Sequence, residues 1–317
     1  MNKTMEQRAD ADTREWVLEV GGSHATAAAI DVDRPDEPFA RHSDETIDGG
    51  APRDELLDTI ARPAQAALRA ASAEAADVHW AVAMPGPFDY DSGVGRFAGV
   101  GKFESLRDVD VRQELAHRLG SPPHQIRFVN DAVAYGIGEW AFGAAERVDR
   151  LVCIALGTGV GSAFLRDGTP VDHGPDVPPA GEAHRIVWNG APLEDTVSTR
   201  AITAQFARRT GRTLAVKEIA ALADTGDDVA RSVLAEAMRA LGAALSPWLK
   251  SFDARHLVVG GSMARSWHLL GSALSDGLQA NGDIAVRPSA LLDTAPLLGA
   301  AAWLRRECLT HPPTTPE

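Results

Sequence analysis

Basic residues and cysteines are scarce in this chain of 317 residues. It carries 31 Lys and Arg against 44 Asp and Glu, which gives a net charge of −13 at pH 7. Because affinity for nucleic acid depends on clustered basic residues that neutralise phosphates, this balance argues against a DNA- or RNA-binding protein. The two cysteines, Cys153 and Cys308, are far apart and lack the spacing of metal ligands, which argues against a zinc site or a disulfide framework.

Long apolar runs are also lacking. No segment approaches the ~20 consecutive apolar residues that a membrane-spanning helix needs. The polar N-terminal stretch has no apolar core of the kind that signal peptides have. We therefore expect a cytoplasmic protein with no membrane partner and no nucleic-acid partner, which acts on small molecules.

The same pattern of elements occurs twice along the chain. Each half begins with an apolar strand, a glycine turn and a returning strand, and alternating helices and strands follow. The turns are Gly21-Gly22-Ser23 and Gly157-Thr158-Gly159. This repetition predicts two related α/β domains with a cleft between them. We expect an N-terminal domain over residues 1–129, joined by the C-terminal helix 296–311, and a C-terminal domain over residues 130–295.

Glycine turns of this kind can present consecutive backbone N–H groups to an anion. A single turn is weak evidence, because β-hairpins need glycine in any case. Two turns at corresponding places point instead to a phosphate chain held between the two halves. The usual phosphate motifs are missing: Gly101-Lys102 is followed by Phe103 and not by Ser or Thr, and the glycines after Leu156 lead into a strand and not into a helix.

Taken in order, the motifs of the chain resemble those of the ROK sugar kinases, within the actin-like ATPase superfamily. The resemblance extends from about Trp16 to Arg306. VNDAVAYGIGE and ALGTGVGSAFLRDG are its most specific parts, and it also includes the Gly-Gly turn, Pro85-Gly86-Pro87, Gly181-Glu182, Leu193-Glu194 and Gly260-Gly261. It implies an α/β fold of two actin-like (ribonuclease H-like) domains with a central cleft. It further implies a homodimer that uses ATP and Mg²⁺.

The resemblance also implies roles for particular residues. A sugar hydroxyl is a weak nucleophile, so a carboxylate must accept its proton during phosphoryl transfer, and by similarity this general base is Asp131. The implied sugar contacts are Asn130, Glu182, His184 and Glu194. The implied nucleotide and phosphate contacts are Gly21, Gly22, Ser23, Gly157, Thr158, Gly159, Gly260 and Gly261, and Glu19 would hold the metal through water. Without the family, Asn130-Asp131 could equally be a helix cap, and the two glutamates solvated surface groups.

Five positions depart from the family pattern. Glu19 stands in place of Asp, and His24 in place of Lys. The Glu-x-x-His spacing is shortened to Glu182-Ala-His184, which leaves Arg185 at the expected His position. The zinc-binding cysteines are missing, so we predict that zinc is absent. The usual Asn-Leu sugar contact is replaced by the stretch 96–99.

The expected function is a kinase that phosphorylates a hydroxyl of a sugar or sugar-like polyol, as a glucokinase does. One alternative is a kinase for a cyclitol or heptulose of secondary metabolism, because three of the departures lie near the acceptor. A second is a non-catalytic sugar-binding sensor of the same fold. Polyphosphate in place of ATP stays open as the donor, because backbone N–H groups recognise phosphate without a nucleoside.

Overall fold

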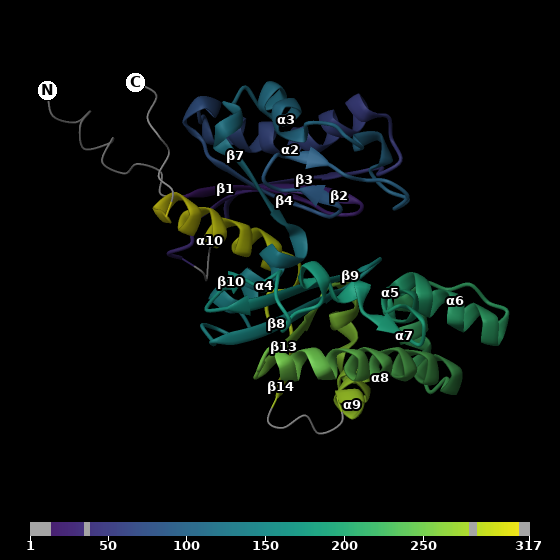
Figure 1. The fold of residues 1–317 in the computed structure, drawn as a ribbon. Helices are drawn as coiled ribbons and strands as arrows, with labels where there is room; N and C mark the ends of the chain where they lie inside the picture. The colour runs from purple at the N-terminus through teal and green to yellow at the C-terminus, as the bar shows by residue number, and fades with distance from the viewer. Residues whose placement is uncertain (1–13, 35–38, 279–283, 311–317) are drawn as a thin grey trace, which may run out of the picture. The chain divides into compact units, whose positions relative to one another are not determined.

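The computed structural model describes residues 14–34, 39–278 and 284–310. The described residues form two compact units (Figure 1). Unit 1 takes its residues from 1–131 and 300–317, and unit 2 is formed by residues 132–299. Each unit has its own sheet and its own hydrophobic core.

Unit 1 is built on a five-stranded sheet with the order β3-β2-β1-β4-β7. The hairpin of β1 and β2 continues antiparallel into β3, whereas β4 and β7 run parallel to β1. Residues in β1, β2 and β4 are almost all buried, as expected for strands covered on both faces. The strands are β1 Glu15–Val20, β2 His24–Ile30, β3 Phe39–Thr46, β4 Trp80–Met84 and β7 Ile126–Asn130, with a small hairpin of β5 Phe88–Asp89 and β6 Val94–Gly95.

Helices α2 (Arg53–Ala71) and α3 (Val111–Leu119) cover one face of this sheet (Figure 1). Helix α2 packs against the sheet and against α3. Its apolar side chains recur at helical spacing and therefore share one face of the helix. The last helix, α10 (Ala295–Thr310), returns to this unit. Its Arg305 lies 3.0 Å from Glu15 of β1 and 2.9 Å from Asp33, so this helix is tied to the first strand.

Unit 2 repeats the topology of the first sheet. Its strand order is β10-β9-β8-β13-β14, with an antiparallel arrangement of the first three strands and a parallel arrangement of the last three. The bounds are β8 Arg150–Leu156, β9 Val160–Arg166, β10 Thr169–Pro170, β13 His256–Gly260 and β14 Ala285–Pro288. Two sheets with the same order and the same strand directions account for the repetition in the sequence.

The longest helix, α8, dominates the core of unit 2. Asp227 caps it by accepting a hydrogen bond from the N–H of Ala230 at 2.8 Å, and α9 packs along it (Figure 1). The helices are α4 Asp131–Phe142, α5 Glu194–Val197, α6 Thr199–Thr210, α7 Val216–Asp224, α8 Asp228–Ser251 and α9 Trp267–Leu278. Among the described helices, none has the length and apolar character needed to cross a bilayer.

Candidate active site

The predicted base lies where a buried strand becomes a helix. β7 ends at Asn130, in register with Met84 of the parallel strand β4, and α4 begins at Asp131. Both residues are half-buried. A carboxylate in the first turn of a helix is also stabilised by the partial positive charge there. This junction therefore places a carboxylate, a group able to accept a proton, where β7 meets α4.

Asn130 is held in place by a residue that the sequence did not single out. Its Nδ2 donates to the Tyr90 hydroxyl at 2.7 Å, and that hydroxyl donates to the backbone oxygen of Met84 at 3.1 Å. A side chain at Gly86 would meet the Tyr90 hydroxyl at 3.5 Å, so the Pro-Gly-Pro turn lies against the same group. The sequence offered one indication of Tyr90, namely that tyrosine is scarce: the chain has 2 tyrosines.

The first glycine turn leaves its backbone open. Gly21 closes the β1–β2 hairpin by donating to the oxygen of His24 at 2.8 Å. Gly22 and Ser23 are exposed, and a Cβ added at Gly22 would meet nothing within 4 Å. This side of the turn therefore has room for an incoming group, as a phosphate site requires.

The two departures from the family pattern beside this turn contact each other. His24 Nε2 lies 3.2 Å from Glu19 Oε2, and the imidazole covers Gly21, whose added Cβ would be 2.6 Å from His24 Cε1. Glu19 is 8% exposed. Glu19, which is longer than the Asp of the family pattern, and His24, which is shorter than its Lys, thus form one pair. The His24 imidazole lies over the turn and contacts the Glu19 carboxylate.

The second glycine turn is anchored to the rest of unit 2 through its backbone. Gly157 donates to the oxygen of Gly159 at 3.0 Å, and its own oxygen accepts from the N–H of Thr199 at the start of α6, also at 3.0 Å. Thr158 is exposed, and a Cβ at Gly157 would meet nothing within 4 Å. Like Gly22, Gly157 faces open space.

The structure brings Glu194 to this second turn. A Cβ at Gly159 would lie 3.1 Å from Glu194 Oε2, and the same oxygen accepts a long hydrogen bond of 3.4 Å from the N–H of Val160. Arg200 Nη2 lies 3.6 Å from the other carboxylate oxygen. A residue predicted to contact the sugar therefore adjoins the predicted phosphate turn within one unit.

Glu182 and His184 lie on a loop beside β9. The short turn over Ala183–Arg185 directs both following basic residues toward Glu182: Arg185 Nε contacts Glu182 Oε2, and His184 Nε2 is 3.7 Å from it. Arg185 thus pairs with the glutamate from the position where the family has His. Glu182 Oε2 is shielded from solvent, and the contact with Arg185 occupies it. A ligand hydroxyl that used this oxygen would have to displace Arg185.

A β-hairpin occupies the place of the missing cysteines. β11 (Val187–Trp188) pairs with β12 (Ala191–Pro192) across Asn189 and Gly190, whose φ angles of 50° and 83° suit a two-residue hairpin turn. Trp188 packs against the core of unit 2. Between Glu182 and Glu194, the loop is therefore held by strand pairing and apolar packing.

The pair Gly260-Gly261 lies beside the second glycine turn. Gly260 is in register with Ala155 of β8, and a Cβ at Gly261 would be 2.3 Å from the oxygen of Leu156. A Cβ at Gly260 would collide with the ring of Tyr135 at 2.4 Å. Both glycines are thus required by packing inside unit 2, and their contact with a nucleotide stays a prediction.

Tyr135 links α4 to this glycine pair through buried hydrogen bonds. Its hydroxyl donates to Ser289 Oγ at 2.8 Å and accepts from the N–H of Gly261 at 3.2 Å. Ser289 donates in turn to Glu139, which is fully buried. Burial raises the pKa of Tyr135 to about 12, although the hydrogen bonds with Ser289 and Gly261 act in the opposite direction.

This raised pKa predicts a loss of stability in strong base. The folded state keeps the Tyr135 proton above the ordinary value of 10.0, so the stabilisation is complete below about pH 10 and is lost as the pH rises toward 12. The free energy of unfolding should fall by roughly 3 kcal/mol over this window relative to Tyr135→Phe. Denaturant unfolding of both proteins at several pH values measures this difference, and equal slopes would contradict it.

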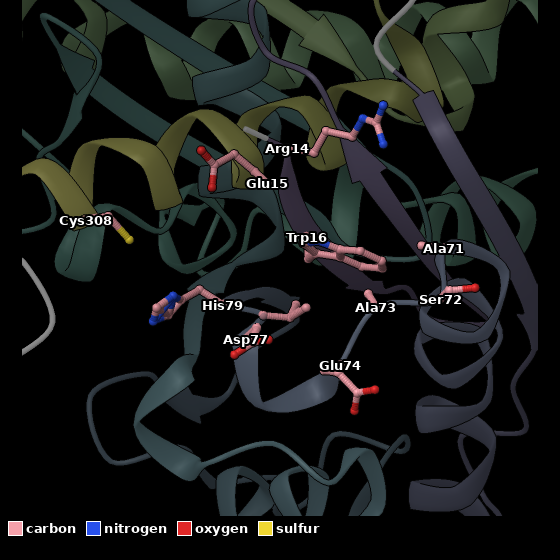
Figure 2. Close-up of a pocket in the computed structure, with 11 residues that line it drawn as sticks. Arg14, Glu15, Trp16, Ala71, Ser72, Ala73, Glu74, Asp77, His79 and Cys308 are labelled. Atoms are coloured by element: carbon pink, nitrogen blue, oxygen red, sulfur yellow. The ribbon is translucent and has the colours of Figure 1, made fainter. Parts of the chain in front are cut away.

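A separate cavity of about 480 Å³ lies in unit 1 (Figure 2). Its lining includes Glu15, Trp16, Asp77, His79 and Cys308. None of the predicted site residues takes part in it. The candidate active site is accordingly defined by the groups described above and not by this cavity.

Comparison with known proteins identifies the family of the chain. The ROK family profile matches residues 16–307. A glucokinase from Thermotoga maritima is 26% identical over 278 residues, which cover 78% of this chain and 85% of that protein.

Two solved structures have the same fold. A ROK family glucokinase from Streptomyces griseus, in complex with glucose and AMPPNP, has a TM-score of 0.74 and 20% identity over 92% of this chain and 99% of its own. A ROK family transcriptional regulator, a homologue of the E. coli MLC protein, also has a TM-score of 0.74, with 20% identity over 91% of this chain and 76% of its own. These likenesses confirm the predicted α/β fold of two actin-like domains. Because the family profile covers nearly the whole chain, the protein belongs to the ROK family.

Proposed function

We propose that the protein is a carbohydrate kinase, which transfers the terminal phosphoryl group of ATP, together with Mg²⁺, to a hydroxyl of a sugar or sugar-like polyol. The observation that carries this proposal is the Asn130-Asp131 junction, where a half-buried carboxylate follows an amide that Tyr90 holds in place. Kinase relatives support it: one is a glucokinase, and another binds glucose and AMPPNP.

In the proposed reaction, Asp131 accepts the proton of the acceptor hydroxyl as its oxygen forms a bond to the γ-phosphorus and the bond from that phosphorus to the β-phosphate oxygen breaks. ADP leaves with the bonding electrons. Asn130 binds a neighbouring hydroxyl, and Glu182 and Glu194 accept hydrogen bonds from others, because carboxylates suit the donors of a polyol.

The two glycine turns would donate backbone N–H groups to the phosphates of the donor. Mg²⁺, when bound, would neutralise charge on the phosphate oxygens. The residues fit a magnesium ion of the usual kind, which binds one or two carboxylates and keeps several waters. Glu19 is a nearly buried carboxylate two residues before Gly21, and it would hold the ion through water.

A sugar-binding sensor is the second candidate. The pairing of His24 with Glu19 favours it, because His24 contacts the carboxylate that the kinase hypothesis assigns to the metal. A transcriptional regulator among the structural neighbours shares the fold. The sensor would bind a polyol without transferring phosphate.

The two candidates differ in turnover. We expect ADP release from Mg²⁺-ATP with one acceptor from a panel of hexoses, amino sugars, heptuloses and cyclitols, and a parallel series with polyphosphate identifies the donor. Calorimetry with the same panel measures binding without catalysis. Binding of a polyol without turnover from either donor would favour the sensor over the kinase.

A further inference from the structure

The first residues of β9 hold both glutamates that are predicted to contact the sugar. The N–H of Val160 donates to Glu194 Oε2 at 3.4 Å. Two residues later, Ser162 Oγ donates to the oxygen of Gly181 at 2.7 Å and accepts from the N–H of Ala183 at 2.8 Å. Gly181 and Ala183 are the two neighbours of Glu182, so the Ser162 hydroxyl forms hydrogen bonds with the backbone on both sides of Glu182.

The residue between them adjoins the helix that begins with the predicted base. A Cβ at Gly161 would lie 2.6 Å from the Cβ of Ala132, which follows Asp131 on α4. Three consecutive residues of β9 thus contact Glu194, the start of α4 and the loop of Glu182. The same strand begins directly after the second glycine turn.

The loop of Glu182 needs this support because its backbone is unusual. Ala180 and Gly181 have φ angles of 57° and 68°, in the left-handed region that residues other than glycine rarely adopt. Gly181 is also packed closely, since an added Cβ would be 3.2 Å from the oxygen of Val171. The backbone on either side of Glu182 sets the direction in which its side chain leaves the loop, before Arg185 pairs with the carboxylate.

We propose that Ser162 is a positioning residue for acceptor binding: its hydroxyl fixes the backbone on both sides of Glu182, so that the carboxylate meets the hydroxyls of the polyol. This inference rests on the proposed function, because it assigns Glu182 to the acceptor. Ser162 acts through Glu182 and need not touch the substrate itself.

Ser162→Ala removes both hydrogen bonds and should raise KM and Kd for the acceptor about tenfold, while KM for ATP stays within about twofold. Ser162→Thr keeps the hydroxyl and should restore acceptor affinity. Ser275→Ala is the matched control, because Ser275 Oγ donates to the oxygen of Gly271 at 3.0 Å within α9, which holds none of the predicted site residues.

Hydrogen exchange supplies a readout that does not depend on catalysis. In Ser162→Ala the Ala183 amide loses its acceptor, so the segment 178–186 should exchange faster without ligand. Unchanged exchange, or faster exchange with an unchanged acceptor KM, would overturn the inference. A parallel rise in the KM values of ATP and acceptor, with a lower melting temperature, would also overturn it by indicating a merely structural role. If wild-type protein neither binds nor phosphorylates a polyol, the proposed function itself fails.

Discussion

Asp131→Asn is expected to lower kcat for phosphoryl transfer by about 10²–10⁴-fold, the range that a positioned general base contributes. Asn keeps the size of the side chain and one of its oxygens but cannot take up the proton of the acceptor. Because binding does not need that proton transfer, dissociation constants for nucleotide and polyol should stay within about threefold. ADP release and calorimetry on the same preparations measure the two effects separately.

The control must account for the position of Asp131 at a helix N-terminus, where a negative charge contributes about 0.3–1 kcal/mol. Asp228 is also the first residue of its helix, α8, and it is exposed. Asp228→Asn therefore makes the same chemical change at an equivalent place without touching the candidate site. A variant at Asp131 that turns over at the wild-type rate would show that another group accepts the proton.

Strands and helices were predictable wherever apolar spacing and turn residues agree. The bounds of the strand Trp80–Met84 and the helix Val111–Leu119 follow from local sequence, since Pro85 comes directly after the first and Gly120 ends the second in a left-handed conformation. The two opening hairpins were also identified from their glycine turns. Local sequence sufficed in these places.

The strand β3 (Phe39–Thr46) could not be predicted in the same way. Its sequence FARHSDET has almost no apolar alternation. It lies at the edge of the sheet and gains its strand conformation from pairing with β2, so a partner distant in sequence decides its structure.

In the candidate site, too, some residues were predictable from local sequence and others depend on distant parts of the chain. Family motifs pointed to Asn130, Glu182 and Glu194, but the groups that hold them come from other parts of the chain. Tyr90 is 40 residues from Asn130. Ser162 is 19 residues from Gly181. Nothing in the spacing of a single motif indicates such contacts, because they depend on the sheet that brings the segments together.

Gly157→Ala and Gly22→Ala are expected to raise KM for the phosphoryl donor about tenfold or more without unfolding the protein. At both positions an added Cβ meets no atom within 4 Å, and neither residue has a φ angle in the left-handed region. The methyl group would therefore cost the fold little, but it would stand on the open side of a turn that we propose holds phosphate. KM for ATP and the melting temperature of each variant separate these effects.

Gly50→Ala serves as the control, since Gly50 lies on the surface outside the site and its added Cβ would meet only Asp48 Oδ1, at 3.3 Å. Backbone N–H groups recognise phosphate oxygens and not the nucleoside. Loss of affinity at Gly22 and Gly157 should therefore extend to polyphosphate wherever polyphosphate binds, whereas a defect near Gly260-Gly261 should affect nucleotides alone. If both variants, Gly22→Ala and Gly157→Ala, have the same KM for the phosphoryl donor as the wild-type protein, the glycine turns do not bind phosphate and serve only as hairpin turns.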